Sequence, residues 1–395
     1  MRETNPITDL NTQEIFDSEN SLEIPIYMKR EIAIVQGDGA IVYDSNGEKY
    51  IDCVSGIGVA SVGHSNSDVV KAITNQASKI ITTPEIFYND TRAQLLKLLN
   101  KITPTELTQI FLCNSGTEAI EAAIKFTKST TGKSEFISMV RGFHGRTIGA
   151  LSASFNKHYK DDFEPLLTGF HFVPFNNFSK LIEKVNENTA GIIVELIQGN
   201  GGVHIAKQEF ILKIRELCNE KGIMLIFDEV QTGFCRTGYM FALEKYGIIP
   251  DILCLAKAMG GGIPIGATIC SSKIEIGLSK HGSTFGGNPL ACAASIATIQ
   301  FMLDNKLSQQ AQEKGEYFLR KLQSLELRLI RKIRQEGLLI GIECKQKVGN
   351  YIIELQNNGL LVNSAGSNVI RLLPPLVISY EQLDLVIEKL SVILN

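Results

Sequence analysis

Three segments of the chain place a reactive side chain directly after an apolar run. The run at residues 223–227 leads into Asp228 and Glu229, and the run DILCLA leads into Lys257, shortly before three consecutive glycines. A third run, IFLC, leads into NSGTEA, where Asn114 or Ser115 can cap the helix that follows. Parallel sheets bind their ligands beyond the carboxyl ends of the strands, so we expect these residues to surround one site.

Each segment has a structural explanation beside the chemical one. NSGTEA is either an ordinary helix start or an anion site, where free N–H groups favour a phosphate and Gly116 lets it approach. Lys257 is either a solvated loop lysine or, because it follows an apolar run, a buried amine with a lowered pKa that attacks carbonyls. Asp228 either caps the next turn or is a buried carboxylate, which needs a cationic or hydrogen-bonding partner.

One cofactor, pyridoxal 5'-phosphate, would satisfy all three segments. It offers a phosphate to the helix start, an aldehyde to Lys257 and a ring nitrogen that needs an acid to stay protonated. Asp228 beside that nitrogen would raise the nitrogen's pKa, typically by ~1–3 pH units for an opposite charge. Gln231 stands three residues after Asp228, a spacing that would let it reach the ring hydroxyl.

The elements that would position these residues alternate between strands and helices. Apolar runs that predict strands are IFLC, FISMV, FHFVPF, GIIVELI, IMLIFDE, DILCLA and ATICSS. Helical patterns lie between them, such as TEAIEAAIKFTKST and KQEFILKIRELCNEKG. This alternation predicts an α/β fold with a mostly parallel sheet that helices cover on both faces.

The two ends of the chain follow other patterns. EIAIVQGDGAIVYDSNGEKYIDC predicts a β-meander, and NPLACAASIATIQFMLDNK begins a region of long helix, short strands and a final helix. We therefore predict an N-terminal segment (residues 1–55) that packs with a small domain, a large cofactor-binding domain (56–290) and that small α+β domain (291–395).

Composition excludes several classes of function. A net charge of −3 without a long basic run argues against nucleic acid as a partner. No apolar stretch reaches the ~18 residues of a membrane span, and the N-terminus MRETNPITDL has no apolar signal core. The eight cysteines form no CxxC pair and no Cys/His cluster, which argues against a metal site and favours the reducing cytoplasm.

Six motifs in the same order resemble those of the class III pyridoxal-phosphate aminotransferases, most closely the acetylornithine aminotransferase group. They are NSGTEA, RGFHGRT, LIFDEVQTGFCRTG, PDILCLAKAMGGGIPIGA, HGSTFGGNPLACAA and VIRLLPPL, and the resemblance covers nearly the whole chain. YIDCVSGIGVASVGH and AGSNVIRLLPPLVI are most similar to the branch that acts on substrates tethered to an amino-group carrier protein. The resemblance implies a fold-type I architecture and a homodimer with active sites at its interface.

The resemblance also implies roles for single residues. Lys257 would bond to the cofactor aldehyde and move the proton, and Asp228 would face the ring nitrogen. Other positions that match cofactor-binding residues of the family are Ser115, Gly116 and Thr117 at the phosphate, Phe143 stacked on the ring, Val230, Gln231, and Thr284 toward the partner subunit's cofactor. Without the motifs, Phe143 would be read as a core aromatic, and Ser283 and Thr284 as a surface turn.

The substrates would be held by arginines, whose planar fork grips a carboxylate at two points. Arg146 matches the position for the α-carboxylate of an acylated diamino acid, with Ser283 near the substrate. Arg371 matches the position for the α-carboxylate of glutamate and 2-oxoglutarate. The structural alternative is an arginine at a strand edge that forms an ion pair on the surface. His64 and His144 are left as structural or supporting residues.

Two positions depart from the family pattern. ELIQGNGG places Asn200 where the family usually has a glutamate that can pair with the arginine equivalent to Arg371. Asn200 cannot neutralise that charge, so we expect Arg371 to stay more available to glutamate. Cys235 stands where the family usually has glycine.

The expected activity is a transaminase that exchanges the ω-amino group of an Nα-blocked ornithine or lysine with 2-oxoglutarate, in arginine or lysine biosynthesis. The blocking group would be an acyl group or a small acidic carrier protein. An aminomutase or decarboxylase of the same fold is the alternative, and a non-catalytic binding protein is a third.

Overall fold

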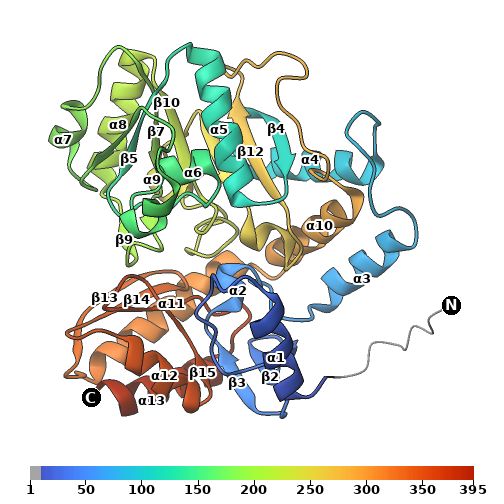
Figure 1. The fold of residues 1–395 in the computed structure, drawn as a ribbon, viewed down its shortest axis with the longest axis vertical. Coiled ribbons are helices and arrows are strands. Elements are labelled where there is room, and N and C mark those ends of the chain that lie inside the picture. Colours follow the sequence, from blue (N-terminus) through green and yellow to red (C-terminus); the bar gives the residue numbers. More distant parts are fainter. Residues whose placement is uncertain (1–9) are drawn as a thin grey trace.

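A computed structural model describes residues 10–395 of the chain, so residues 1–9, with most of the predicted polar N-terminus, lie outside the described part. The molecule has an upper and a lower layer (Figure 1). The upper layer is built on a seven-stranded sheet of order β4-β12-β11-β10-β7-β5-β6. The bounds of these strands are β4 Leu107–Cys113, β5 Glu135–Met139, β6 Phe170–Val173, β7 Thr189–Val194, β10 Met224–Asp228, β11 Ile252–Leu255 and β12 Gly266–Ser271.

The seven strands correspond to the seven predicted apolar runs. All neighbours pair in parallel except β12, which is antiparallel to both β4 and β11. Ile193 of β7 and Ile226 of β10 pack with the side chains of α5, whereas Leu225 and Phe227 pack with those of α8. Both faces of the sheet are thus covered by helices, as a mostly parallel sheet requires.

The helices end where the sequence supplies caps. α5 (Gly116–Thr131) begins after Ser115, and α8 (Gln208–Lys221) ends at Gly222; both helices end at a glycine with φ of +61° to +67°, which glycine adopts without steric cost. Other helices of the upper layer are α3 Ser67–Ala77, α4 Asp90–Ile102, α6 Ile148–Ala153, α7 Phe178–Ile182, α9 Leu243–Tyr246 and the short 3-10 turn Lys257–Gly260. α10 (Pro289–Asp304) is apolar all round and packs against α3 and α4.

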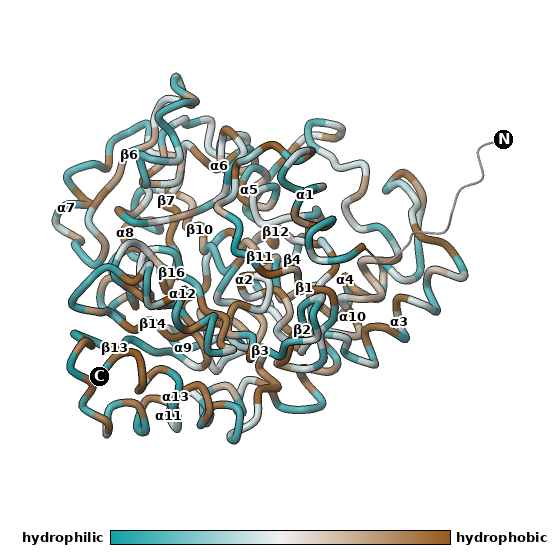
Figure 2. The backbone as a smooth tube through the Cα atoms, turned by 60° about the horizontal axis from the view of Figure 1, so that its bottom comes forward, coloured by the Kyte–Doolittle hydropathy of each residue, from teal (hydrophilic) through white to brown (hydrophobic). Residues whose placement is uncertain are grey.

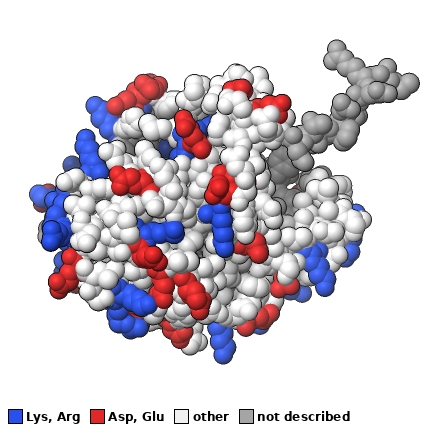
Figure 3. Space-filling model, turned by 90° about the horizontal axis from the view of Figure 1, so that it is seen from below, with Lys and Arg blue, Asp and Glu red and all other residues white. Residues whose placement is uncertain are grey.

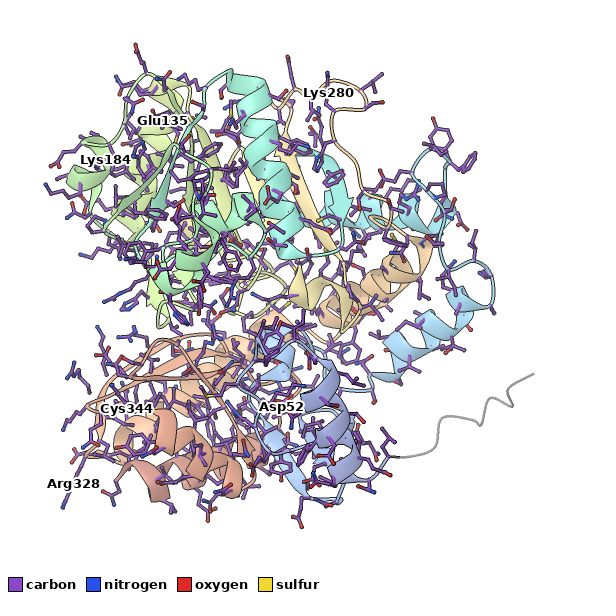
Figure 4. All side chains as sticks on the ribbon, viewed as in Figure 1. Asp52, Glu135, Lys184, Lys280, Arg328 and Cys344 are labelled. Atoms are coloured by element: carbon purple, nitrogen blue, oxygen red, sulfur yellow. The ribbon has the colours of Figure 1, made fainter. Side chains whose placement is uncertain are left out.

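The lower layer joins the two ends of the chain. β1 (Ile34–Asp38), β2 (Ile41–Asp44) and β3 (Lys49–Asp52) form the predicted meander, and β15 (Leu360–Leu361) pairs in parallel with β3. Figure 4 labels Asp52, from the N-terminal segment, and Cys344, from the C-terminal part, in this same layer. The domain boundaries at residues 55 and 290 stay a prediction.

A second four-stranded sheet, of order β13-β14-β17-β16, completes the lower layer. Its elements are β13 Ile330–Glu336, β14 Leu339–Cys344, β16 Asn363–Ser364 and β17 Val369–Leu372, with α1 Thr12–Leu22, α2 Ser55–Gly58, α11 Leu307–Ser324, α12 Gly349–Asn357 and α13 Tyr380–Leu394 around both sheets. A two-stranded hairpin, β8 (Ile197–Gln198) with β9 (His204–Ile205), extends from the upper layer.

Surface and core follow the usual division. α11 and α13 alternate hydrophilic and hydrophobic segments along their length (Figure 2), and Leu322 and Leu390 are among their buried residues. The face seen from below carries basic and acidic residues interspersed (Figure 3). Within residues 10–395, no helix is long and apolar enough to cross a membrane, and no three His, Cys, Asp or Glu side chains form a metal-binding group.

Candidate active site

A cavity of about 480 Å³ opens at the carboxyl ends of β4, β10 and β11. Nine of the predicted site residues line it, namely Ser115, Gly116, Thr117, Phe143, Arg146, Asp228, Val230, Gln231 and Lys257. Ser283, Thr284 and Arg371 do not line it within this one chain. The residues that follow these three strands therefore meet at one cavity, as expected.

The start of α5 forms one wall of the cavity. Ser115 is the N-cap, since its Oγ accepts a hydrogen bond from Glu118 N at 3.3 Å. Gly116 and Thr117 open the helix, and their N–H groups have no acceptor inside it. A Cβ on Gly116 would lie 2.5 Å from Cγ1 of Val230, so only glycine fits here. The wall thus combines free backbone donors with a close approach to the loop after β10.

Asp228 is buried at the base of the cavity and makes two hydrogen bonds. Its Oδ2 accepts from Nδ1 of His144 at 2.7 Å, and its Oδ1 accepts from Val230 N at 3.1 Å. Burial lowers the pKa of His144, but the hydrogen bond and charge of Asp228 outweigh it and raise the pKa overall. His144 therefore orients Asp228 at the cavity.

Two further buried carboxylates flank this pair. Glu195 accepts a hydrogen bond from Phe143 N at 3.0 Å, and burial raises its pKa to about 7 although His144 opposes the shift. Glu229, next to Asp228, points away and accepts hydrogen bonds from Ala242 N and Leu243 N. Of these two adjacent acids, Asp228 lines the cavity, whereas Glu229 stabilises the fold through its backbone hydrogen bonds.

Lys257 follows β11 and is only partly exposed. Burial lowers the pKa of its amine to about 8. The charge of Asp228 opposes this shift, and the charge of Arg371 adds to it. Its φ of +47° lies in the left-handed region, which costs a residue with a Cβ of the order of 1–3 kcal/mol. The backbone thus holds the lysine in a strained turn, a feature that clusters at functional sites.

Arg371, on β17, reaches up from the lower layer and is 3% exposed. Its Nη1 donates to Oδ1 of Asn200 and, at 3.2 Å, to Oε1 of Gln231, while Nε has no partner within the described chain. Burial lowers its pKa to about 10, so it stays charged at neutral pH. A buried cation whose hydrogen bonds go to neutral amides is suited to bind a carboxylate.

Arg146 lies at the exposed side of the cavity. Its guanidinium carbon is 3.9 Å from the ring centroid of Tyr159 and 5.7 Å from that of Phe143. The two rings contact each other edge to face with centroids 5.9 Å apart. Stacking on Tyr159 leaves the guanidinium edge free for hydrogen bonds.

Ser283 and Thr284 lie outside the cavity, on the loop before α10. Ser283 Oγ accepts from Nδ2 of Asn114, a cavity residue, at 3.2 Å, and from Gly286 N at 2.9 Å. Thr284 and Phe285 are exposed. Thr284 thus contributes nothing to this chain's own cavity.

The family model described as aminotransferase class-III matches residues 26–394. The chain belongs to the class III aminotransferases. A [LysW]-aminoadipate semialdehyde transaminase of Deinococcus radiodurans is 45% identical, over 100% of this chain and 91% of its own length. An acetylornithine aminotransferase of Methanosarcina mazei is 43% identical, over 95% of both chains.

The fold also matches that of a solved structure. An ornithine aminotransferase of Toxoplasma gondii, with partial occupancy of PLP at its active site, superposes with a TM-score of 0.92 and 30% identity, over 97% of this chain and 94% of that one. The fold is fold-type I, and the cofactor of the family is pyridoxal 5'-phosphate, as the sequence predicted.

The residues of this class III aminotransferase fit that cofactor. The donors at the start of α5 suit a phosphate, Lys257 is the amine at the base of the cavity, and Asp228 is the carboxylate that can face a ring nitrogen. The sequence prediction did not specify two contacts of the site. His144, expected to be a structural or supporting residue, hydrogen-bonds Asp228 directly, and nothing in the sequence pointed to this partner or to Tyr159 beside Arg146.

Proposed function

We propose that this class III aminotransferase exchanges the ω-amino group of an Nα-blocked ornithine or lysine with 2-oxoglutarate, in arginine or lysine biosynthesis. The observation that carries the proposal is the pair of arginines around one lysine. Arg371 is buried and hydrogen-bonds Asn200 and Gln231, which line the cavity, whereas Arg146 is exposed and lines the cavity itself. Two carboxylated substrates that react in turn at one lysine each need an arginine that binds their carboxylate.

The proposed roles follow from the geometry. Pyridoxal phosphate supplies the electron sink when it is bound. Lys257 carries the proton, because a pKa of about 8 lets its amine both lose and regain a proton near neutral pH. Asp228, held by His144, keeps a ring nitrogen protonated, and the N–H groups at Gly116 and Thr117 anchor the phosphate.

The two arginines divide the substrates between them. Arg371, in a buried environment, takes the α-carboxylate of glutamate and 2-oxoglutarate. Arg146, on the open side and stacked on Tyr159, takes the carboxylate end of the bulkier Nα-blocked substrate. The similarity to relatives named for an acetylated and for a LysW-linked substrate supports an Nα-blocked amine.

We further propose a cytoplasmic homodimer. All eight cysteines are buried and unpaired, which suits a reducing compartment. Thr284 is exposed and does not line this chain's own cavity, which suits a residue that serves the partner subunit's site. A carrier-linked substrate would make a small acidic protein a second partner.

The test is a turnover assay of the purified enzyme with Nα-acetylornithine, followed by detection of the semialdehyde product. Product formation that requires 2-oxoglutarate and yields one glutamate per turnover is the expected result. Turnover without 2-oxoglutarate would instead indicate an aminomutase or decarboxylase, which the transaminase relatives do not favour. A carrier-linked lysine or ornithine is the parallel substrate that identifies the blocking group.

A further inference from the structure

A second groove, of about 710 Å³, is lined by residues of β9 and β13. β9 belongs to the upper layer and lies above β13 of the lower layer (Figure 1). Its walls are the β8–β9 hairpin, the segment after β5, the loop after β6 and β13. It shares no lining residue with the catalytic cavity. The groove is therefore a separate space that the transaminase account does not use.

The groove is lined by positive charge and by no carboxylate. Arg141, Lys332 and Arg334 line it together with His204. Burial and the neighbouring Arg334 and Arg141 lower the pKa of His204 to about 4, so its imidazole is neutral. Nη1 of Arg141 lies 2.9 Å from Nε2 of His204, which therefore accepts the hydrogen bond.

These cations are not fully neutralised by the protein. Arg334 pairs with Glu343 at 2.7 Å, but Arg141 and Lys332 have no carboxylate partner within residues 10–395. Arg141 also has a φ of +70°, so its backbone is held in the left-handed region beside the groove. Two unpaired cations and an Arg fork around one concave space suit a small anion with more than one negative charge.

The groove is connected to the catalytic cavity through the β8–β9 hairpin. Asn200, which lines the catalytic cavity and contacts Arg371, lies in the turn of this hairpin. Nε of Arg334 donates to Gly202 O at 2.7 Å, two residues further along the same turn. An anion that draws Arg334 toward the groove would compete with that hydrogen bond and loosen the turn that carries Asn200.

We propose that this groove binds a small anion of two or more charges, a phosphate or a dicarboxylate, and that its occupancy acts on Asn200 through the hairpin. Lys332 and Arg141 supply the charge, and Arg334 links the bound anion to Gly202. The functional half of the inference rests on the proposed role of Arg371, whereas the binding half does not.

The binding test titrates the holoenzyme with inorganic phosphate at low ionic strength and follows the phosphorus resonance for exchange broadening. Lys332→Ala is expected to weaken the binding at least about tenfold, the effect of losing one charge-assisted contact. Lys347→Ala removes the same charge from an exposed position that does not line the groove, and is expected to bind as the wild type does. Equal affinity in Lys332→Ala and wild type overturns the proposal.

Two further arms extend this test. Succinate is titrated in the same way, and whichever anion loses more affinity in Lys332→Ala is the class that the groove takes. Phosphate is then expected to change the KM for 2-oxoglutarate in wild type and Lys347→Ala but not in Lys332→Ala. If Lys332→Ala alters only the KM for a carrier-linked substrate and binds phosphate normally, the groove is a docking surface and the proposal is wrong.

Discussion

Lys257 carries the chemistry of the proposed reaction through its lowered pKa. In the enzyme stripped of cofactor, we expect labelling of Lys257 by an amine-reactive reagent to rise through a midpoint near pH 8, because the neutral amine reacts. Exposed lysines should show midpoints near ~10.4. Peptide mass spectrometry across pH reads both in one sample, and a Lys257 midpoint equal to that of the exposed lysines would contradict its proposed environment.

The lowered pKa of Lys257 also makes the stability of the folded protein depend on pH. The unfolded chain binds more protons than the folded one between pH 8 and ~10.4, so the contribution of Lys257 to stability rises with pH across this window. Below pH 8 the folded protein buries a protonated amine, so the full penalty of that burial applies. Lys257→Met in the cofactor-free protein should therefore flatten the pH dependence of the free energy of unfolding.

We propose that Asn200 sets how readily Arg371 binds the α-carboxylate of 2-oxoglutarate. A glutamate at this position would pair with Arg371, whose hydrogen bonds now go to the amides of Asn200 and Gln231. Asn200→Glu is therefore expected to raise the KM for 2-oxoglutarate about tenfold or more, the size of a charged hydrogen bond. Asn200→Gln keeps a neutral amide and serves as the control. Unchanged or tighter binding of 2-oxoglutarate in the glutamate variant would show that Arg371 is not its site.

Cys235 shows how a residue can depart from the family at a cost in backbone conformation. Its φ of +68° is a conformation that glycine adopts freely and that a residue with a Cβ adopts with strain. The family's glycine is explained by this conformation. The buried thiol of Cys235 fills space that glycine would leave empty, which offsets part of the strain.

At the scale of elements, the start of α5 depends on the absence of a side chain at Gly116. Gly116→Ala would press a methyl group against Val230, so we expect weaker binding of pyridoxal phosphate and a loss of about 1–3 kcal/mol in stability. Val230→Ala in the same chain removes the obstructing methyl groups and should restore much of both. Cofactor affinity by fluorescence and unfolding by denaturant measure the two effects, and a double variant as weak as Gly116→Ala would contradict the packing argument.

The elements themselves were largely predictable from the sequence, and their contacts were not. Seven apolar runs gave the seven strands, and the strand-end rule placed Asp228, Lys257 and NSGTEA at one cavity, because these signals are local. The antiparallel direction of β12 was not visible, since an apolar strand buried on both faces reads the same in either direction. The contact of Gln231 with Arg371 joins residues 140 positions apart and depends on how the two layers meet.

At the scale of the whole molecule, several large apolar side chains are left on the surface. Ile86, Phe87, Tyr88 and Phe285 are exposed, and the segments that carry them are joined where Leu290 N donates to Ile81 O. Contiguous exposed apolar residues mark interfaces. Together with the exposed Thr284, they support the proposed homodimer.

We expect sedimentation equilibrium to give a mass near 87 kDa, twice the 43.5 kDa of one chain. The double variant Ile86→Asp and Tyr88→Asp should shift the mass toward one chain and lower activity, because charges at a buried interface are costly. Leu22→Asp adds a charge at an exposed apolar residue elsewhere and is the matched control. A wild-type mass of one chain with full activity would rule out a shared site.

The measurement that tests the central claim most directly is a spectral half-reaction of the holoenzyme without any keto acid. Glutamate and Nα-acetylornithine are added separately, and loss of the absorbance of the lysine-bound cofactor is followed in time. We predict that glutamate converts the cofactor to its aminated form and that the Nα-blocked ω-amine, free or carrier-linked, does the same. If glutamate leaves the spectrum unchanged while the enzyme still consumes the ω-amine, the aminotransferase account of Arg371 and Lys257 is wrong.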